Sequence, residues 1–401
     1  MFTKLNLFLI TFLLASLCFR FWQSWPKPAI YQNAEKIELT AVLTSQPEIY
    51  PKSQRFEVQG LKIITGLYPQ YSYGDRLKIS GTLQNGVLIF PAIEVIEKGQ
   101  GNWLMSLRKK LIQLFESSLP EPSSSLLLGI FLGVKRGLPS DFYLALRKTG
   151  VLHVVVASGM NVTMVISFTL AILSYFFKRR LVLPLTFLAI LFYTGLSGFD
   201  PPIVRAAIMG GVMLLGSFFG RLNLGVLSLF LAGFLMTFLD PKLIFDLGFQ
   251  LSFLSTAGLI FIKPLFLIEK EDSFYLLKDD LTTTISAQLA TLPILLSNFG
   301  QYQGLSLLVN TLVLWTTPIL MGFGGAVVLL GLIFTPLARL GALLALPFLI
   351  YFEKIVVFVS QFSLAEIRVG KWPIFFTLAY YCLLTSILIF CYKRKSQLKN
   401  L

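Results

Sequence analysis

Long apolar runs separated by short polar breaks fill the chain from Val151 onward. Many of them approach the ~20 residues that an α-helix needs to cross a bilayer. We predict nine membrane-spanning helices here, at residues 151–177, 181–196, 203–219, 224–239, 243–267, 283–299, 305–334, 336–361 and 373–392. Residues 151–392 are therefore expected to form a polytopic helical domain embedded in a membrane.

Basic clusters beside the predicted spans indicate an orientation. Lys178-Arg179-Arg180 and Lys393-Arg394-Lys395 are the densest clusters of this kind, and clustered Lys and Arg favour the cytoplasmic side. Nine spans then connect an outer start at Val151 with a basic cytoplasmic tail at 393–401. An odd number of spans places the two ends on opposite sides of the membrane, which agrees with the orientation that the basic clusters indicate.

An apolar run at Leu5–Trp22, within residues 1–30, has two interpretations: a cleaved signal peptide or a retained anchor helix. Ala15-Ser16-Leu17 offers the small residues of a cleavage site, but bulky Phe19 and Trp22 follow directly. We therefore predict a retained transmembrane anchor. This makes about ten transmembrane helices in all, with both termini in the cytoplasm.

Residues 34–98 show a different pattern, with short apolar alternations broken by turn residues. Alternation with a period of two predicts strands, and Asn85-Gly86 between two β-rich runs predicts a hairpin. Five or so strands in ~65 residues predict a small β-barrel, for which an OB-like fold is the first candidate. Because Lys4 precedes the anchor, this domain is expected on the extracytoplasmic face.

The connecting segment 101–150 is expected to form amphipathic and short membrane-associated helices. Trp103–Leu119 alternates apolar and basic positions at helical spacing, which is typical of a helix on the membrane surface. Leu126–Val134 is apolar but too short to span, so it is either a re-entrant segment or a helix packed against the bundle. A further short helix is predicted at Pro139–Lys148.

The composition agrees with a membrane protein, since 55% of the residues are hydrophobic and 13% are charged. The net charge of +14 would also suit a nucleic-acid partner, but Lys and Arg accumulate in cytoplasmic loops of membrane proteins as well. Cys18, Cys382 and Cys391 lie in apolar runs, which supports neither a disulfide framework nor a zinc site. No motif indicates a catalytic centre, a metal or a cofactor.

The most informative stretch is Gly150–Val165, which places polar residues inside an apolar run. On a helix, His153 and Asn161 share one face, and Ser158 and Gly159 lie between them. Polar side chains at membrane depth are costly and usually face a bundle interior or a water-filled path. We therefore predict that this helix lines a path through the bundle.

A second polar group lies in Tyr193–Ala206. Pro201-Pro202 interrupts the helix, and Arg205 lies in the first turn of the next one, close enough to Asp200 to pair with it. A snorkelling arginine paired with its neighbour is one interpretation. A role in a pore is the other, because non-helical backbone at membrane depth is tolerated where it lines a cavity.

A third group consists of Asp246 and Gln250, four residues apart on one predicted helix face. Burying them requires a partner, which Arg205 or Lys263 could supply. Polar or kinked positions continue at Gln288, Pro293, Asn298 and Asn310. Each residue alone is typical of polar contacts between helices, whereas their number in one bundle favours a hydrated path.

Four stretches together resemble the ComEC-type competence proteins, which carry transforming DNA across the bacterial cytoplasmic membrane. GVLHVVVASGMNV resembles the family's HLLAISGLHV signature, and YTGLSGFDPPIVRAAIM its Tyr-x-x-x-Gly…Arg-Ala segment. GFQLSFLSTAGLI resembles a GFQLSFLAT stretch, and TLPILLSNFGQYQGLSLLVN a Pro…Phe-Gly…Asn region. They occur in family order, and with the β-domain the resemblance spans roughly Ala34 to Tyr392.

The resemblance implies an inner-membrane channel for single-stranded DNA that has no enzyme activity of its own. By matching positions it implies pore roles for His153, Ser158, Gly159, Arg205, Gln250 and Asn310, which join Asn161 and Asp246 as candidates. Asn161 stands where the family usually has a second histidine. Many relatives carry a C-terminal metallo-β-lactamase-like domain, and this chain has none before it stops at Leu401. A separate nuclease and a cytoplasmic helicase-like motor are therefore expected as partners.

The charges suggest where DNA would gather outside the membrane. Acidic and basic residues balance within Glu35–Lys98, so the β-domain is not globally basic. Its tyrosines and Phe56 could stack bases, although core packing accounts for most of them. The basic excess lies next to it, and we predict a DNA funnel at Arg108, Lys109, Lys110, Lys135, Arg136, Arg147 and Lys148. Anionic membrane lipid is the alternative ligand.

The leading hypothesis is thus a multi-pass channel that passes single-stranded DNA inward during competence. A transporter of another anionic polymer or nucleotide is the first alternative. An intramembrane hydrolase is the second, and it would require His153 and Ser158 within hydrogen-bond reach. Five residues apart on one helix, these side chains point about 140° away from each other, which disfavours the hydrolase.

Overall fold

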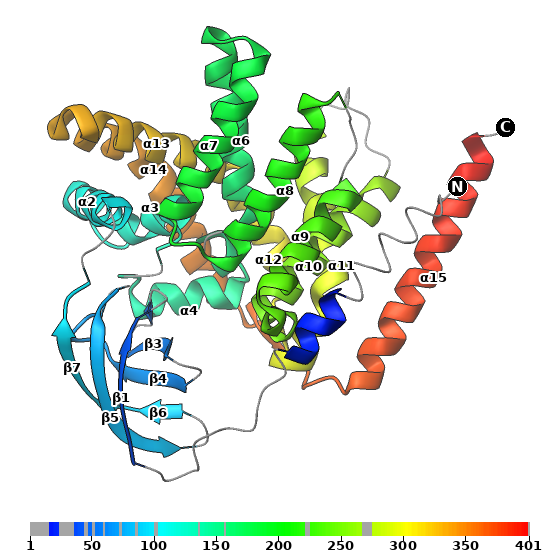
Figure 1. The fold of residues 1–401 in the computed structure, drawn as a ribbon. Helices are drawn as coiled ribbons and strands as arrows, with labels where there is room; N and C mark the ends of the chain where they lie inside the picture. Colours follow the sequence, from blue (N-terminus) through cyan, green and yellow to red (C-terminus); the bar gives the residue numbers. More distant parts are fainter. Residues whose placement is uncertain are drawn as a thin grey trace.

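The computed structural model describes residues 16–23, 36–43, 47–49, 53–58, 61–71, 74–84, 87–99, 103–134, 137–155, 158–220, 225–266 and 275–399. These residues form an N-terminal sheet and a larger, mostly helical part. The sheet lies at one end of the helices, below α4 (Ser140–Thr149) in the view of Figure 1.

Seven strands form the N-terminal sheet, which curves into a half-barrel (Figure 1). They are β1 (Lys36–Val42), β2 (Glu48–Ile49), β3 (Ser53–Val58), β4 (Leu61–Gly66), β5 (Arg76–Gln84), β6 (Val87–Ile89) and β7 (Ala92–Glu97). The order is β1-β5-β6-β4-β3-β2, with β7 also paired to β5. The predicted β-domain is confirmed as a half-barrel, while the OB-like assignment stays a prediction.

Alternating side chains hold this sheet together. Ile37 and Leu39 of β1 and Leu77 and Ile79 of β5 point to the buried face, and their neighbours along each strand are exposed or half-buried. This is the pattern expected when one face of a sheet covers a core. Antiparallel pairing of Gln84 with Val87 confirms the predicted hairpin, whose two turn residues lie outside the described residues.

A buried amide closes the end of the sheet. The Gln54 Nε2 donates to the carbonyl oxygens of Gly66 at 2.8 Å and Pro69 at 2.6 Å, and Oε1 accepts from the Tyr71 N–H at 3.4 Å. Tyr71 packs edge-on against Phe56, with ring centroids 5.8 Å apart. Both rings are buried in the core, as the sequence suggested, whereas Tyr68 is exposed; Tyr50 and Tyr73 lie outside the described residues.

The helical part contains both long and short helices. Those up to the middle of the chain are α2 (Trp103–Ser118), α3 (Ser123–Leu132), α4, α5 (Leu152–Val155), α6 (Gly159–Phe176), α7 (Arg179–Leu196), α8 (Pro201–Phe218), α9 (Gly225–Leu239) and η1 (Pro241–Phe245). The others are α10 (Leu247–Phe261), η2 (Lys263–Leu265), α11 (Tyr275–Phe299), α12 (Ser306–Val313), α13 (Thr316–Ile333), α14 (Thr335–Ser360), η3 (Ser363–Ala365) and α15 (Ile374–Lys399). The two short strands β8 (Gln301–Tyr302) and β9 (Ile367–Arg368) pair with each other.

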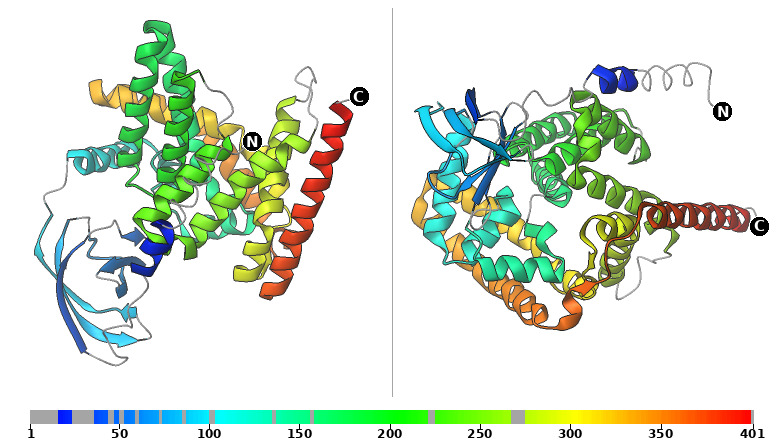
Figure 2. Two further views of the ribbon diagram at one scale, coloured as in Figure 1. Left: turned by 45° about the vertical axis from the view of Figure 1, so that its right-hand side comes forward. Right: turned by 90° about the horizontal axis from the view of Figure 1, so that it is seen from below.

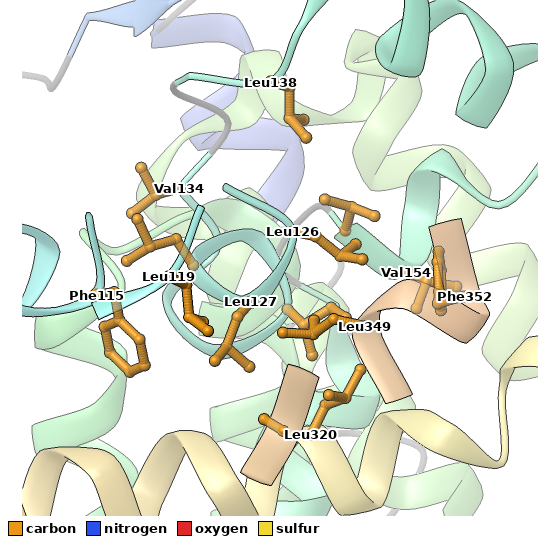
Figure 3. Close-up of a cluster of buried hydrophobic side chains, with 14 of the residues drawn as sticks. Phe115, Leu119, Leu126, Leu127, Val134, Leu138, Val154, Leu320, Leu349 and Phe352 are labelled. Atoms are coloured by element: carbon orange, nitrogen blue, oxygen red, sulfur yellow. The ribbon is translucent and has the colours of Figure 1, made fainter. Parts of the chain in front are cut away.

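Helix α3 lies at the centre of the largest hydrophobic core. Nearly all of its side chains are buried, so this short apolar stretch is a helix enclosed by the bundle. Figure 3 shows Leu126 and Leu127 of α3 among Phe115 of α2, Leu320 of α13 and side chains of α14. An apolar helix that is covered on all sides needs no polar face.

Five helices among the described residues are long and apolar enough to cross a membrane, and a sixth span results if the bent pair α12–α13 counts as one. The five are α6, α7, α14, α15 and the stretch Leu247–Leu265. Three further apolar helices are shorter, namely α3, the Pro202–Phe218 part of α8, and α9. These helices do not confirm the predicted count of about ten, and most of the predicted anchor lies outside the described residues.

Helix α15 forms the outer edge of the bundle and packs mainly on α11 (Figures 1 and 2). Three tyrosine hydroxyls attach it to backbone carbonyls: Tyr380 to Leu289 at 3.0 Å, Tyr381 to Ala290 at 2.9 Å, and Tyr392 to Phe261 at 3.0 Å. Pro293 has no N–H for the Leu289 carbonyl, so Tyr380 supplies the missing donor. The Tyr380 contact therefore compensates for the proline in α11.

The part of the predicted anchor that the structure describes, residues 16–23, is helical. Arg20 places its guanidinium at the end of α9, where Nε donates to the Phe238 carbonyl at 3.2 Å and Nη2 to the Leu239 carbonyl at 3.5 Å. The guanidinium also lies 5.7 Å from the Phe238 ring centroid. A cation at a helix C-terminus satisfies free carbonyls and complements the helix dipole.

Candidate functional site

Helix breaks and polar side chains coincide in the membrane part of the protein. The turn Ser197–Asp200 separates α7 from α8, Asp246 separates η1 from α10, and α12 meets α13 at a 45° bend. Helix α6 begins after Ser158, which is extended. Within the turn, Gly198 has φ +86° and Phe199 has φ +58°, a left-handed conformation that strains a phenylalanine. Non-helical backbone at membrane depth must be buried in protein or line a water-filled cavity.

His153 is the exposed residue of the short helix α5. Its neighbours Val154 and Val155 are buried, and Val155 packs on Gly129 of α3 so closely that a side chain there would collide with it. His153 Nδ1 donates to the Gly150 carbonyl at 2.9 Å, since a carbonyl can only accept. In the neutral ring, Nε2 is therefore left as an acceptor on an exposed side chain.

Asn161 and Tyr193 bind the end of the buried helix α3. Asn161 is fully buried, and its Nδ2 donates to the Ile130 carbonyl at 2.8 Å. The Tyr193 hydroxyl donates to the neighbouring Phe131 carbonyl at 2.8 Å. The last carbonyls of a helix lack partners within it, and α3 is buried in the core. The two side chains therefore complete the C-terminus of α3.

Ser158 and Gly159 form the start of α6. The Ser158 hydroxyl donates to Asn161 Oδ1 at 3.1 Å and does not cap the backbone N–H groups of the helix. His153 and Ser158 thus have other hydrogen-bond partners, and the pairing that a hydrolase would need is not formed among the described residues. A Cβ at Gly159 would lie 3.4 Å from the Ala206 side chain, so α6 and α8 meet at this point.

Arg205 is the most unusual buried residue of the bundle. Only 2% of it is exposed, and neither Nη1 nor Nη2 has a hydrogen-bond partner among the described residues. Its guanidinium lies 5.5 Å from the Phe253 ring centroid. A desolvated cation–π contact contributes about 2 kcal/mol, while burying an unpaired charge costs several times as much. The contact with Phe253 alone does not offset that cost.

Asp246 and Gln250 are both occupied by local contacts at the start of α10. Asp246 Oδ1 accepts from the Phe249 N–H at 2.7 Å and caps the helix, while its charge acts on Arg205 from a distance. Gln250 Nε2 donates to the Ile244 carbonyl at 2.8 Å. Lys263, the other partner considered from the sequence, pairs with Asp279 at 2.8 Å.

A polar network lies where the His153 segment meets the start of α12. Gln288 Nε2 donates to the Ser306 hydroxyl at 2.9 Å, and the Tyr302 hydroxyl donates to Gln288 Oε1 at 3.4 Å. Gly150 packs against this group, since a Cβ there would lie 2.8 Å from Ser306 Cβ. One turn along α12, Asn310 is buried and its Oδ1 has no partner among the described residues. The segment around Gly150, helix α11 and the start of α12 are distant in the sequence, and they meet at this network.

The described funnel residues lie on two helices, α2 and α4. Lys109 and Lys110 are exposed on α2, and Arg147 and Lys148 are exposed at the end of α4. Lys135 and Arg136 lie outside the described residues. Arg147 Nη2 donates to Gln301 Oε1 at 3.4 Å, and Gln301 is the strand partner of Arg368, so a further basic residue lies near the end of α4.

Arg108 differs from the other funnel candidates because it points into the protein. Its buried Nη1 has no hydrogen-bond partner among the described residues and contacts Gly198, where any side chain would displace it. Burial lowers the pKa of this guanidinium, and the nearby Asp200 carboxylate opposes the shift. Arg108 therefore links the surface helix α2 to the break between α7 and α8.

The sequence did not single out three residues that the structure makes prominent. Tyr193 and Phe253 are aromatic residues in apolar runs, where composition does not distinguish them from core residues. Glu353 of α14 accepts from the Ser123 hydroxyl at 2.6 Å. A lone acid inside an apolar run was the available signal for it. Among the described residues, no three His, Cys, Asp or Glu side chains gather as metal ligands would.

Known proteins resemble this chain mainly in its membrane part. The family described as "Competence protein" matches residues 130–394. ComE operon protein 3 of Bacillus subtilis (strain 168) is 31% identical over 234 residues, which are 57% of this chain and 29% of that protein. An uncharacterized protein of Aquifex aeolicus (strain VF5) is 30% identical over 129 residues, 32% of this chain and 30% of that protein.

The matched segments thus span less than a third of these two relatives. No solved structure matches the chain. The family match covers well over half of the chain and includes all four helix breaks and the polar residues around them. The chain therefore belongs to the competence protein family.

Proposed function

We propose that the protein is the membrane component through which a single strand of DNA enters the cell during competence. The observation that carries this proposal is the family match over residues 130–394. The same region holds the broken helices and the buried polar side chains, which a bundle that only anchors a domain would not need. DNA uptake is the role that the competence family supports, and the passage of one strand through this bundle is our extension of it.

The chemistry of the site supports a hydrated, polar path. Single-stranded DNA carries a charged phosphate at every nucleotide, so it crosses a membrane only where water and hydrogen-bond donors replace lipid. His153 is exposed and keeps a free ring acceptor, and the network of Gln288, Tyr302 and Ser306 lies beside its helix. These groups are the proposed lining of the path, with Asn310 further along α12.

The entrance is proposed at the end of the bundle that carries the β-domain. Helix α4 lies next to the sheet in Figure 1, and Arg147 and Lys148 in its last turn immediately precede the Gly150–His153 segment. Their position suits a funnel that delivers phosphates to His153. Lys109 and Lys110 on the exposed side of α2 suit anionic lipid headgroups.

We further propose that the protein resides in the bacterial cytoplasmic membrane, with the β-domain outside and both termini inside. A separate nuclease would degrade the second strand, and a cytoplasmic helicase-like motor would pull the first. The path itself needs no catalytic residue, metal or cofactor in this scheme. The apolar helices of the structure support the membrane location.

The test is uptake of labelled DNA by a naturally transformable host that carries this gene, compared with the same host after deletion of the gene. A plasmid copy carrying His153→Ala replaces the wild-type gene. Loss of one hydrogen-bonding group, worth about 1 kcal/mol, lowers the uptake rate roughly fivefold. Ser174→Ala is the matched control, because this exposed hydroxyl binds only the Ala171 carbonyl of its own helix.

Membrane insertion of each variant is measured in parallel by extraction and immunoblotting. Reduced uptake with normal insertion supports the path, while wild-type uptake by His153→Ala removes this residue from it. The proposal as a whole fails if the deletion strain still takes up DNA. A loss of labelled nucleotide or polyphosphate uptake in that strain would instead favour a transporter of another anion.

A further inference from the structure

Arg205 is a buried arginine whose terminal nitrogens have no hydrogen-bond partner among the described residues. Its guanidinium is enclosed between α8 and α10, with both terminal nitrogens buried and unbonded. Neither of the two ion pairs formed among the described residues includes it. A guanidinium offers donors in a planar fork that match the oxygens of a phosphate group. Its bonding capacity is therefore unused in this conformation.

The surroundings of Arg205 favour an anion. The N-terminus of α6 lies close to Arg205. Gly159 in its first turn packs against Ala206, the residue that follows Arg205 in the chain. Because Ser158 leaves the first turn of α6 without a side-chain cap, the partial positive charge of this helix end remains available. The carboxylate that acts on Arg205, that of Asp246, is held by the backbone of α10 through its Oδ1.

Phe253 fixes the position of the guanidinium. Its ring covers Arg205 at 5.5 Å and packs against Phe249, with ring centroids 4.5 Å apart. On its other side, a Cβ at Gly233 would lie 3.0 Å from the ring, so α9 leaves just enough space for it. The ring is thus held in one place by α9 and by its own helix. The cation–π contact with this fixed ring thereby holds the guanidinium in position.

We propose that Arg205 is a phosphate-binding residue of the DNA path and that Phe253 is its positioning residue. This inference rests on the proposed function, which supplies the phosphodiester as the anion. A phosphate that reaches Arg205 replaces the missing partner with two charge-assisted hydrogen bonds. Since only 2% of Arg205 is exposed and the Phe253 ring is held in place, the phosphate enters when the first turn of α6 moves aside.

The experiment measures binding of a fluorescent single-stranded oligothymidylate to the full-length protein in detergent, by anisotropy, across a range of salt concentrations. Each phosphate neutralised on a single strand contributes about 0.7 to the slope of log K against log salt. Arg205→Gln is expected to weaken binding and to reduce the slope by this amount. Arg179→Gln is the matched control, because this exposed arginine also loses one charge but binds the Ser217 carbonyl.

Phe253 variants test the positioning role. Phe253→Leu removes the aromatic face and is expected to reduce the slope as Arg205→Gln does, although the charge remains. Phe253→Tyr keeps the face and is expected to retain the wild-type slope. A purely structural role for Phe253 would change the amount of folded protein and leave the slope of the folded fraction unchanged, which would overturn this part.

Arg205→Lys covers the case in which Arg205→Gln fails to fold. It keeps the charge but loses the planar fork, so weaker binding with an unchanged slope supports the proposal, and unchanged affinity contradicts it. If Arg205→Gln keeps the wild-type slope and deletion of the gene still abolishes DNA uptake, the inference about Arg205 is wrong and the proposed function stands. If the wild-type protein itself binds no oligothymidylate and its deletion spares uptake, the proposed function fails instead.

Discussion

At the scale of single residues, the buried polar side chains divide into two kinds. Asn161 and Tyr193 give their hydrogen bonds to the carbonyls of α3 and thereby complete its structure. The partly exposed Gln250 likewise donates to the carbonyl of Ile244. Arg205 instead retains unbonded donors. Only a residue of the second kind has bonding capacity left for a passing ligand, so polarity at membrane depth is not by itself a sign of a path.

Asn161→Ala is expected to lower the free energy of unfolding by about 1–3 kcal/mol, because it leaves the buried Ile130 carbonyl without a donor. Thr163→Ala is the control on the same helix, since this exposed hydroxyl binds the Gly159 carbonyl of its own helix. Thermal unfolding in detergent, followed by tryptophan fluorescence, measures both. Equal melting temperatures for the two variants would contradict the structural role of Asn161.

At the scale of elements, short helices and breaks organise the bundle. Helix α3 is surrounded by the other helices, and the breaks bring Gly150, Gly159 and Gly198 against residues of other elements. Helix α15 is attached through tyrosine hydroxyls to carbonyls near Pro293. In each case a residue of another element packs against or bonds to the backbone at an irregular point of a helix.

Gly198→Ala is expected to destabilise the protein more than Gly220→Ala. Both glycines have a positive φ, so both alanines carry the backbone cost of about 1 kcal/mol. Only the alanine at 198 also displaces the Arg108 guanidinium, since nothing lies within 4 Å of a Cβ at 220. In an Arg108→Ala background, the difference between the two melting temperatures should disappear. A difference that persists would show that Arg108 does not cause it.

Tyr380→Phe is expected to cost about 1 kcal/mol through loss of the hydrogen bond to the Leu289 carbonyl. With Pro293→Ala, the new N–H at position 293 can bind the same carbonyl, and the cost of Tyr380→Phe should shrink. A double-mutant cycle of unfolding temperatures measures this coupling. Additive effects would mean that the hydroxyl and the proline act independently.

At the scale of the whole molecule, the sheet lies at one end of the helices and α15 stands at their edge (Figure 2). Several polar residues of the four family-like segments, among them Asn161, Arg205 and Asn310, are buried in the helical part. Such an arrangement fits a protein whose two ends face different compartments. The proposed orientation assigns the sheet to the outside and the basic end of α15 to the cytoplasm.

Cysteine labelling of intact cells tests this orientation. Cys18, Cys382 and Cys391 are replaced by serine, and single cysteines are introduced as Gln84→Cys on the sheet or Lys393→Cys on α15, both at exposed positions. A membrane-impermeant maleimide is expected to label the first variant in intact cells and the second only after lysis. The reverse pattern would invert the proposed topology.

The sequence alone determined the features that depend on local pattern. Period-two alternation is enough to predict the β-domain and the β5–β6 hairpin, because each strand covers a core with one face. Apolar runs are enough to predict a helical membrane part, because only helices satisfy their own backbone there. Family-like segments such as GFQLSF were visible because they are contiguous in the chain.

Only the tertiary structure decided what each polar residue does, because its partner is distant in sequence. Asn161 donates to a carbonyl of α3 that is thirty-one residues away in the sequence. Lys263 forms its ion pair with Asp279 and not with Asp246. Hydrophobicity is a sum over a window, so it did not distinguish a continuous span from helices such as α12 and α13 that meet at a bend. Whether a buried arginine is paired depends on the packing of three helices, and for Arg205 that packing left it unpaired.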